Sequence, residues 1–439
     1  MPSGSAIVIG AGIAGLAAAH RLSRLGMNVV VLEASERVGG RMVTDRREGF
    51  VIDRGAQFLS DGYPVIGELI RELGLARQIS HTSGWAGTVR GGKVRRINSR
   101  YPWTLATSGL VGWRDLIRIA RASRALTRAT RQLPLSDYSR WHGMDDADAA
   151  QWAAAAFGRG ALAYLFEPML DGFYFQSPEG MSRAWPAIVW SFGARRKAVV
   201  ALEGGIGRLP EALARAQTIH LRTPAEAVET SGSVARVKTS GWTLEADAVV
   251  LATTAPAAKR IYSPANDTEK RMLETEYSAT VCVAVALAEG VSGAGVARDI
   301  YGVLIPRRER GVIASIGVES QKCRGYVPRG ELLNVMLCGE AGLRLLRAPE
   351  EQLLAEVMPE LRRYFPGIDG KIKFVQIARW EEAEPRSPVG RCRDIHEYRR
   401  TWHRGMKVVL AGDYMGTPCT EGAAESGTWA ANALAGAGA

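Results

Sequence analysis

The hydrophobic pattern at the start of the chain alternates short apolar runs with one longer amphipathic segment. Residues 5–9 form an apolar run, and a glycine-rich turn follows. Residues 16–25 have helical periodicity and end at Gly26, a residue suited to a helix C-cap. A second apolar run, residues 28–32, comes directly after. The pattern predicts strand, turn, helix and strand, which is how a parallel βαβ unit begins.

Further along the chain, helical and strand-like patterns fall into blocks. Residues 63–131 are predicted to be mostly helical, with a turn or small hairpin at Gly91 and Gly92, and more helix is expected over 147–166. Apolar runs typical of strands return later, at 218–228, 234–237, 248–253, 279–287, 312–318, 333–338 and 407–411. Further helices are expected at 267–276 with Asp267 as N-cap, at 349–365 and at 421–434. Parallel βαβ units combined with later antiparallel strands predict two interleaved domains.

Length and composition narrow the class of protein. The chain has 439 residues, 46% of them hydrophobic, which is enough to bury the cores of two domains. No apolar run is long enough to span a bilayer, and the first strand begins too early to leave room for a signal peptide, so a cytoplasmic protein is expected. The five cysteines form no CxxC pair, which argues against a metal site and for free thiols.

Basic residues concentrate in one stretch. From Arg77 to Arg131 there are twelve basic residues and one acid, Asp115, so this stretch carries the whole net charge of +11. On a helix over residues 113–133, leucine and isoleucine fall on one side and six arginines on the other, namely Arg114, Arg118, Arg121, Arg124, Arg128 and Arg131. Such a helix suits peripheral contact with an anionic inner membrane surface, an anionic substrate or an acidic partner; the alternative is a solvated face packed on its own domain. No nucleic-acid motif accompanies it.

The turn after the first strand has the spacing of a dinucleotide site. Gly10, Gly12 and Gly15 permit a tight turn, a close approach of backbone to pyrophosphate, and close packing of helix on strand. Ile13 and Ala14 lie at the start of the helix, where free N–H groups and the positive end of the dipole favour phosphate. Glu33 ends the next strand, at the spacing of an acid that binds a ribose hydroxyl, and it disfavours NADP.

The residues that follow resemble the flavin motifs of the flavin-containing amine oxidase superfamily, which includes monoamine oxidases, protoporphyrinogen oxidases and phytoene desaturases. The first such segment runs from Glu33 to Arg41, and the next covers residues 55–58. The resemblance implies FAD as cofactor, with two arginines near the pyrophosphate and the glycines against the ribityl chain or the flavin. The residues expected in this part of the site are Ala34, Arg37, Gly39, Gly40, Arg41, Gly55, Ala56, Gln57 and Phe58.

Two later segments match the same superfamily. Residues 204–214 resemble its glycine–leucine–proline turn, and residues 223–228 its second FAD segment, in which the backbone of Ala225 would meet the adenine. Near the C-terminus, residues 410–427 resemble the closing motif of phytoene desaturases. There Asp413 would bind the ribityl chain or the pyrophosphate, and the start of the last helix would face the flavin ring. The residues expected to bind the cofactor here are Gly412, Asp413, Thr420, Glu421, Gly422 and Ala423.

The fold that the resemblance implies is α/β. A Rossmann-like FAD-binding domain of the glutathione-reductase type would comprise residues 1–62, 195–265 and 375–439. An α+β substrate-binding domain would comprise residues 63–194 and 266–374. FAD is expected to be bound non-covalently, although Cys392 lies in a stretch comparable to that of relatives with a cysteine-linked flavin.

Candidate catalytic residues are pocket walls beside flavin N5. Trp380 belongs to a segment that resembles the arginine–tryptophan motif of protoporphyrinogen oxidases, and Phe173, Tyr174 and Phe175 lie where the superfamily's substrate domain turns back to the flavin. Met415 is a further candidate wall. Each of these is also compatible with plain core packing.

The chain departs from the monoamine oxidases at two positions. Val281 stands where those enzymes carry a lysine, and Cys419 where they carry an aromatic residue. The departures favour the porphyrinogen oxidase and desaturase branches.

The sequence therefore predicts an FAD-dependent oxidoreductase that removes hydride from a small, largely apolar substrate at a C–C or C–N bond. Catalysis is expected to depend on flavin N5 and pocket shape, with O₂ or a quinone as electron acceptor. Two alternatives stay open. One is an amine or amino-acid oxidase that releases H₂O₂, and the other is a flavin-free binding protein of the Rab GDP-dissociation-inhibitor type. The presence of Glu33, Arg41 and Asp413 in the flavin motifs argues against the second.

Overall fold

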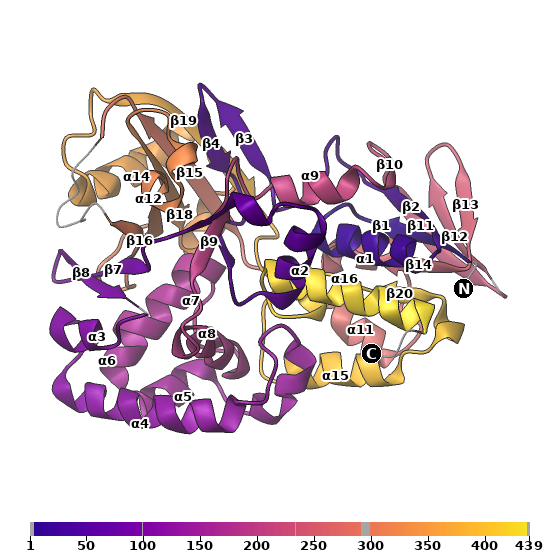
Figure 1. The fold of residues 1–439 in the computed structure, drawn as a ribbon, viewed down its shortest axis with the longest axis horizontal. Coiled ribbons are helices and arrows are strands. Elements are labelled where there is room, and N and C mark those ends of the chain that lie inside the picture. The colour runs from indigo at the N-terminus through magenta and orange to yellow at the C-terminus, as the bar shows by residue number, and fades with distance from the viewer. Residues whose placement is uncertain (1–3, 99, 233, 291–298, 437–439) are drawn as a thin grey trace.

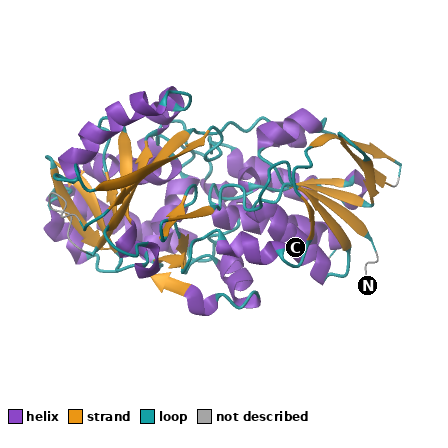
Figure 2. Ribbon diagram, turned by 90° about the horizontal axis from the view of Figure 1, so that it is seen from above, coloured by secondary structure: helices purple, strands orange, loops and turns teal. Residues whose placement is uncertain are grey.

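The structure is a computed structural model, and it describes residues 4–98, 100–232, 234–290 and 299–436. Figure 1 shows a smaller lobe on the right, built around one parallel sheet, and a larger lobe on the left, in which a second sheet lies above a layer of helices. In the view from above, loops and short strands connect the two lobes along the middle of the molecule (Figure 2). Both described ends of the chain lie in the smaller lobe.

The smaller lobe is built on a parallel sheet with strand order β10-β2-β1-β14-β20. Its strands are β1 (Ser5–Ile9), β2 (Asn28–Leu32), β10 (Thr218–His220), β14 (Ala248–Leu251) and β20 (Val408–Leu410). Two helices cross against it, α1 (Ile13–Arg24) and α16 (Thr420–Ala435). A Cβ atom on Gly427 would lie 2.0 Å from the carbonyl oxygen of Ala14, so glycine is what lets the two helices cross this closely. The strands' carboxyl ends and both helix N-termini thus meet at one edge, where doubly wound sheets bind ligands.

The larger lobe contains a seven-stranded sheet with the order β19-β15-β18-β17-β16-β7-β8, antiparallel except for the pair β16 and β7. Its strands are β7 (Trp85–Arg90), β8 (Lys93–Asn98), β15 (Thr280–Leu287), β16 (Ile300–Leu304), β17 (Ile313–Val318), β18 (Glu331–Leu337) and β19 (Ile372–Trp380). One face packs on α13 (Gly339–Leu345) and α14 (Glu350–Tyr364). The other face meets α7 (Glu167–Tyr174), where the Ser315 hydroxyl donates to the Gly172 carbonyl oxygen at 2.7 Å.

Smaller sheets join these two. The hairpin β3 (Thr44–Arg47) and β4 (Phe50–Asp53) leads from the parallel sheet into the larger lobe. A three-stranded sheet is formed by β5 (Leu59–Ser60), β9 (Val199–Leu202) and β6 (Ile79–His81), and an antiparallel meander by β11 (Ala225–Ser231), β12 (Val234–Thr239) and β13 (Thr243–Ala246). The remaining helical elements are α2 (Pro64–Glu72), α3 (Trp103–Ser108), α4 (Trp113–Thr130), η2 (Tyr138–Met144), α5 (Ala149–Ala156), α6 (Arg159–Ala161), η3 (Leu162–Phe166), α8 (Ala184–Ala194), α9 (Arg208–Ala214), α10 (Ala255–Ile261), α11 (Asp267–Leu273), α12 (Glu319–Lys322) and α15 (Arg391–Thr401), together with the 3-10 turns η1 (Ala76–Gln78), η4 (Arg324–Tyr326), η5 (Arg404–Met406) and η6 (Asp413–Met415).

The expected α/β fold is confirmed, and one predicted helix proves to be broken. Residues 63–131 are mostly helical, as expected, in α2, η1, α3 and α4, and the expected hairpin at Gly91 and Gly92 is formed by β7 and β8, which extend the seven-stranded sheet. The helix expected over 147–166 breaks at Gly158, whose φ of 103° suits glycine, and resumes as a short π-helical turn.

Two boundaries also differ from expectation. The cap of α11 is Asn266, whose side chain accepts from the Glu269 N–H, and not Asp267. The predicted domain boundary at residue 375 falls inside β19, an unbroken strand paired along its length with β15, so that strand belongs wholly to the larger sheet. Among the residues described, no helix is long and apolar enough to cross a membrane.

Candidate active site

A cavity of about 620 Å³ lies where the two lobes meet and is lined by residues from both. One end begins at the carboxyl edge of the parallel sheet, beside the N-termini of α1 and α16. The other end reaches the seven-stranded sheet and the C-terminus of α7. We call these the cofactor end and the substrate end.

The glycine turn after β1 opens the cofactor end. Gly10 has a φ of 102°, and a Cβ atom there would lie 2.7 Å from the Ala252 carbonyl oxygen. A Cβ atom on Gly15 would lie 1.9 Å from the Gly10 carbonyl oxygen. At Gly12, the N-cap of α1, a Cβ atom would meet nothing within 4 Å, so this backbone faces open space. The arrangement presents the N-terminus of α1 to the cavity and suits a pyrophosphate.

Glu33 lies beside this turn. Its carboxylate accepts from the Ala11 N–H at 2.7 Å and from the Ser35 N–H at 2.8 Å, and it lines the cavity. The two backbone donors fix the carboxylate in one position, which leaves its remaining lone pairs for a ligand hydroxyl.

Arg41 and Asp413 form an ion pair on the cavity wall, with 2.6 Å between Nη1 and Oδ2. Asp413 also accepts from the Tyr277 hydroxyl at 2.9 Å, and Arg41 donates to the Ala383 carbonyl oxygen at 2.8 Å. The carboxylate raises the pKa of Arg41 against the opposing effect of burial. Arg41 is therefore neutralised within the protein, whereas Arg37 forms no ion pair with any residue that the structure describes and donates to the Gly40 carbonyl oxygen at 3.0 Å.

The segment 55–58 is held from behind by a buried cluster of charges. Lys322 donates to Asp53 and to the Gln57 carbonyl oxygen, both at 3.0 Å, and also pairs with Glu319. Asn334 of β18 donates to the Gln57 side chain at 2.7 Å. The larger lobe thus fixes the backbone that faces the cavity, and pairing of each buried charge offsets the desolvation it suffers.

Aromatic and sulfur-containing side chains form the substrate end. Phe58 and Phe173 meet edge to face, with 5.1 Å between ring centroids. Trp380 donates from Nε1 to the Arg54 carbonyl oxygen at 2.8 Å, and its ring lies against Gly55. Phe175 adopts a φ of 55°, a left-handed conformation that is strained for a phenylalanine. These walls continue with Cys282 and Met336.

Strand alternation corrects one expectation on β15. Val281 does not face the cavity, because it packs with Leu337 in the core on the other face of the sheet. Thr280 and Cys282 face the cavity instead, and neither is the lysine of the monoamine oxidases. Cys419 lines the cavity as expected from the closing motif.

Most of the predicted site residues line this one cavity: Gly10, Gly12, Ile13, Ala14, Glu33, Arg37, Gly39, Gly40, Arg41, Gly55, Ala56, Gln57, Phe58, Phe173, Tyr174, Trp380, Gly412, Asp413, Thr420 and Ala423. They come from six separate segments of the chain, and the fold brings these segments together around the cavity.

Five predicted residues lie outside the lining, namely Gly15, Ala34, Ala225, Glu421 and Gly422. Gly15 packs on Gly10, Ala34 is exposed, and Ala225 pairs with Thr239 in the meander. Glu421 turns away and accepts from the N–H groups of Val65 and Ile66 at the start of α2, 2.9 and 3.0 Å away. A Cβ atom on Gly422 would lie 2.1 Å from the Thr417 carbonyl oxygen.

Met415, a further candidate wall, is buried in the core away from the cavity. Sequence reasoning also missed lining residues. Thr253 and Thr254 follow β14, and their place at the carboxyl edge of a predicted parallel strand is a signal that could have found them. Glu384 lies on the wall between the two ends, and no sequence signal identified it.

The cofactor end fits a flavin adenine dinucleotide. Open backbone at Gly12, a fixed acid at Glu33 and the guanidinium of Arg37 match the needs of pyrophosphate and ribose. The segments at 55–58 and the start of α16 then border the place left for the flavin ring. When bound there, FAD would supply hydride acceptance at N5.

Comparison with known proteins assigns the class. The sequence model of the family described as flavin-containing amine oxidoreductase matches residues 13–435. A coproporphyrinogen III oxidase of Propionibacterium freudenreichii subsp. freudenreichii is 26% identical over 90% of this chain and 85% of that protein. A coproporphyrinogen III oxidase of Mycobacterium tuberculosis (strain ATCC 25618 / H37Rv) is 28% identical over 95% of each chain.

Solved structures share the fold. A putative protoporphyrinogen oxidase from Exiguobacterium sp. 255-15 superposes with a TM-score of 0.76 at 22% identity, over 98% of each chain. Cyclohexylamine oxidase from Brevibacterium oxydans IH-35A gives a TM-score of 0.77 at 20% identity, over 99% of each chain.

Fold and site together define an FAD-dependent oxidoreductase, an oxidase or dehydrogenase. More particularly, the chain belongs to the flavin-containing amine oxidoreductase family. The predictions of FAD as cofactor and of an enzyme of this superfamily are confirmed.

Proposed function

We propose that the protein oxidises a C–H bond next to nitrogen or to a conjugated carbon in a substrate whose reacting part is apolar. The observation that carries this proposal is the wall of the substrate end, formed by Phe58, Phe173, Phe175, Met336 and Trp380. Apolar walls exclude water and hold a substrate close to the hydride acceptor, which is what this chemistry needs from the protein.

A porphyrinogen is the first candidate substrate. Two relatives that match over at least 90% of this chain are coproporphyrinogen III oxidases by name. Thr280 and Cys282 stand on β15 in place of a lysine, which also separates this chain from the monoamine oxidases. Porphyrinogens are flat and apolar in the middle and lose hydrogen from carbon and nitrogen, as the site would require.

An apolar amine is the second candidate. The substrate end carries a carboxyl group, Glu384, and Arg41, the cation nearest to it, is already paired with Asp413. An acid without a free basic neighbour suits a substrate nitrogen better than it suits the carboxylates of coproporphyrinogen. One structural neighbour is a cyclohexylamine oxidase by name, which agrees with an apolar ring that carries nitrogen.

Anaerobic bleaching of the bound FAD tests the proposal. The holoenzyme is mixed without oxygen with coproporphyrinogen III, protoporphyrinogen IX, cyclohexylamine, putrescine and a set of amino acids. One of the first three is expected to bleach the absorption near 450 nm within minutes. If none does, or if only amino acids do, the proposed reaction is wrong. Re-exposure to O₂ or to a soluble quinone then identifies the electron acceptor.

We also propose that the flavin is held without a covalent bond. Cys392 is buried behind Tyr138, away from the cavity. Two other thiols line the cavity, but burial raises the pKa of Cys282 to about 12 and that of Cys419 to about 11, so both stay protonated and poorly nucleophilic. Acid precipitation should leave the yellow colour in solution, and colour in the pellet would contradict this.

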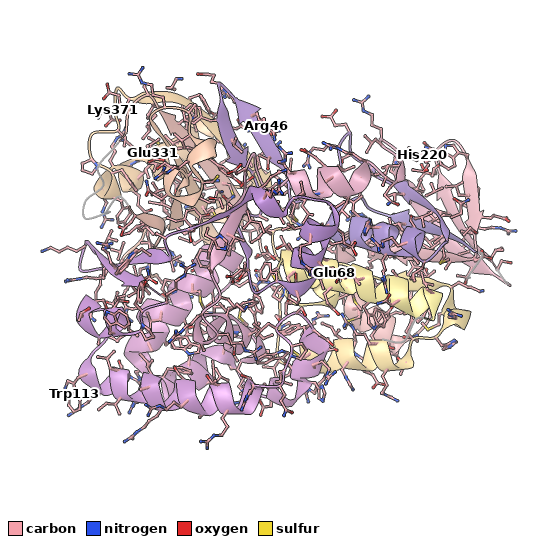
Figure 3. All side chains as sticks on the ribbon, in the orientation of Figure 1. Arg46, Glu68, Trp113, His220, Glu331 and Lys371 are labelled. Carbon is pink, nitrogen blue, oxygen red and sulfur yellow. The ribbon has the colours of Figure 1, made fainter. Side chains whose placement is uncertain are left out.

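A second surface supports contact with an anionic membrane. On α4 the five arginines from Arg114 to Arg128 and the following Arg131 are exposed, whereas Ile119 and Leu126 face inward. Trp113 and Trp103 are 67% and 64% exposed, and Figure 3 places Trp113 at the outer corner of the molecule. Tryptophan beside arginine is typical of proteins that rest on the headgroups of anionic lipids.

Vesicle co-sedimentation tests this contact. We expect the holoenzyme to sediment with vesicles that contain anionic lipid, less so as salt rises, and the double variant Trp103→Ser, Trp113→Ser to lose most of this binding. Trp242→Ser is the matched control, because Trp242 is 40% exposed on the other lobe. Binding that ignores lipid charge and salt would leave α4 as a solvated face.

A further inference from the structure

Glu384 is a carboxyl group in the cavity that the protein itself does not use. It follows β19 in the segment 381–385, and its side chain lines the cavity. Its backbone carbonyl oxygen accepts from the Ser278 N–H at 2.8 Å, which fixes the chain at this point. Its carboxyl oxygens, in contrast, make no hydrogen bond or ion pair with any residue that the structure describes. The carboxylates of Glu33 and Asp413, by comparison, are held by hydrogen bonds or an ion pair within the protein.

The titratable groups close enough to Glu384 to interact with its charge come from four different segments. They are Arg41 before β3, Tyr174 at the end of α7, Asp413 after β20 and Cys419 before α16. Arg41, the cation among them, is already paired with Asp413. Burial, and then the charge of Asp413, raise the pKa of Glu384 well above its usual range, while Arg41 acts in the opposite sense. A buried carboxyl group without a hydrogen-bond or ion-pair partner is unfavourable, and a bound ligand can supply the missing partner.

Its position joins the two ends of the cavity. Cys419 precedes α16, whose N-terminus borders the cofactor end, and Tyr174 belongs to the aromatic wall of the substrate end. Glu384 is close enough to both for its charge to raise their pKa values further. The carboxyl group therefore lies where a bound substrate would meet the cofactor, among walls that otherwise offer few polar groups.

We propose that Glu384 is a catalytic base that accepts the proton released by the substrate's nitrogen when the neighbouring C–H bond is oxidised. The inference rests on the proposed function and deepens it, because it requires a substrate with N–H next to the reacting carbon. In the balanced step, the carbon gives up hydride, with both electrons of its C–H bond, to oxidised FAD. The N–H bond breaks, its electron pair forms the new C=N or conjugated double bond, and the proton goes to a carboxylate oxygen of Glu384.

The same assignment holds for both candidate substrates. An amine becomes an imine, and a porphyrinogen gains a methene bridge while one pyrrole nitrogen loses its proton. A base with a raised pKa accepts a proton more readily than an ordinary carboxylate does, but only once it is ionised. The rate of flavin reduction should therefore rise with pH through the pKa of Glu384 and then level off.

The experiment compares three holoenzymes: wild type, Glu384→Gln, and the control Glu276→Gln. Glu276 lies on the segment hydrogen-bonded to that of Glu384, and its side chain is 82% exposed. General-base catalysis contributes about 10²–10⁴-fold, so Glu384→Gln should slow anaerobic reduction at least about 100-fold and flatten its pH profile. Glu276→Gln should match wild type, and FAD affinity should stay within about threefold in all three. Glu384→Asp should restore part of the rate and its pH dependence.

A second readout needs no substrate. The visible absorption of the oxidised holoenzyme is titrated from pH 5 to 9, because ionisation of a carboxyl group beside the flavin shifts its bands. Wild type and Glu276→Gln should show an inflection that Glu384→Gln lacks. If wild type lacks the inflection, the role of Glu384 as a base is wrong, whether or not any compound bleaches the flavin. If the inflection is present but no compound bleaches the flavin, only the proposed function is contradicted. Reduction of Glu384→Gln within about threefold of wild type overturns it as well.

Discussion

The two ends of the cavity are built in different ways. The cofactor end is made mainly of backbone from short contiguous motifs, and its charged side chains, Glu33, Arg41 and Asp413, are held by the protein. The substrate end is made of side chains that separate elements of the larger lobe contribute one or two at a time, and the carboxyl group of Glu384 in its wall has no partner in the described part of the chain. The charged groups named at the cofactor end are thus paired within the protein before a ligand binds, whereas the substrate end offers a carboxyl group that a bound substrate can partner.

The difference explains why members of one family act on different compounds. Backbone geometry tolerates few substitutions, so we expect the cofactor end to differ little among proteins that bind FAD in this way. A wall of side chains can be rebuilt residue by residue without disturbing the strands that carry it, as Thr280 and Cys282 on β15 illustrate. The substrate of this chain must therefore be sought in the second end alone.

Gly12→Val should break the cofactor end most severely. A Cβ atom at Gly12 would meet no protein atom within 4 Å, so we expect the fold to survive while the valine occupies the space left for the pyrophosphate. We expect FAD affinity to fall at least about 1,000-fold, about 4 kcal/mol, with a Tm of the apoprotein within a few degrees of wild type. Fluorescence titration with FAD and thermal unfolding measure the two quantities.

Gly15→Ala is the companion variant, because its Cβ atom would lie 1.9 Å from the Gly10 carbonyl oxygen. That variant should lose stability as well as FAD. Retention of FAD by Gly12→Val would mean that the pyrophosphate does not lie at this turn.

Glu33→Ala should weaken the same end by less. The carboxylate holds the Ala11 and Ser35 N–H groups and is positioned for a ribose hydroxyl, so its removal costs one charge-assisted hydrogen bond, about 1.5–3 kcal/mol. FAD affinity should drop about 10- to 150-fold. Glu36→Ala is the control, since its side chain is 72% exposed and its ion-pair partner, Arg222, is exposed as well. Equal losses in both variants would mean that Glu33 acts only through net charge.

The same contrast governs what could be predicted from sequence. The glycine turn, Glu33, the segment 33–41 and the start of α16 are local, and their function follows from backbone conformations that few sequences adopt. The failures are non-local. Nothing in the sequence near Glu421 indicates that its carboxylate binds the N-terminus of α2, which lies more than 350 residues away.

Long-range pairing likewise decided what was missed around the predicted hairpin. The turn at Gly91 and Gly92 is a local signal, but the addition of β7 to the large sheet depends on its pairing with β16, about 215 residues further on. Val281 was placed on the cavity because a motif position says nothing about which face of a strand it occupies; only the register of β15 with β18 and β19 decides that. Glu384 is identified by the absence of a hydrogen bond or ion pair to its carboxyl group among the described residues, which only the folded structure shows.

Glu421→Gln tests whether a motif residue that was expected at the cofactor end belongs to it. Burial raises the pKa of Glu421 to about 7, above its value near 4.5 in the unfolded chain. The folded state therefore binds more protons between these values, and the stability that the protonated group contributes is lost as pH rises from about 4.5 to 7.

Glu421→Gln should remove up to about 1.4 kcal/mol per pH unit from the slope of unfolding free energy in that range, with FAD affinity unchanged. Urea unfolding at pH 5, 6, 7 and 8 measures the slope. A large loss of FAD affinity would return Glu421 to the cofactor site.

Tyr174→Phe should have the smallest effect and sharpens the comparison at the substrate end. Tyr174 packs edge to face on Trp185 at 4.9 Å, and burial raises the pKa of its hydroxyl well above the usual range, so the phenol stays neutral and is a poor acid or base. Removing the hydroxyl should change anaerobic flavin reduction by less than tenfold, under about 1.4 kcal/mol in the barrier. Trp380→Ala is the contrasting variant at the same end: it opens space beside Gly55 and should slow reduction more than Tyr174→Phe does, through poorer positioning of the substrate. If Tyr174→Phe proved the slower of the two while FAD stayed bound, the hydroxyl would be part of the proton path and Glu384 would not act alone.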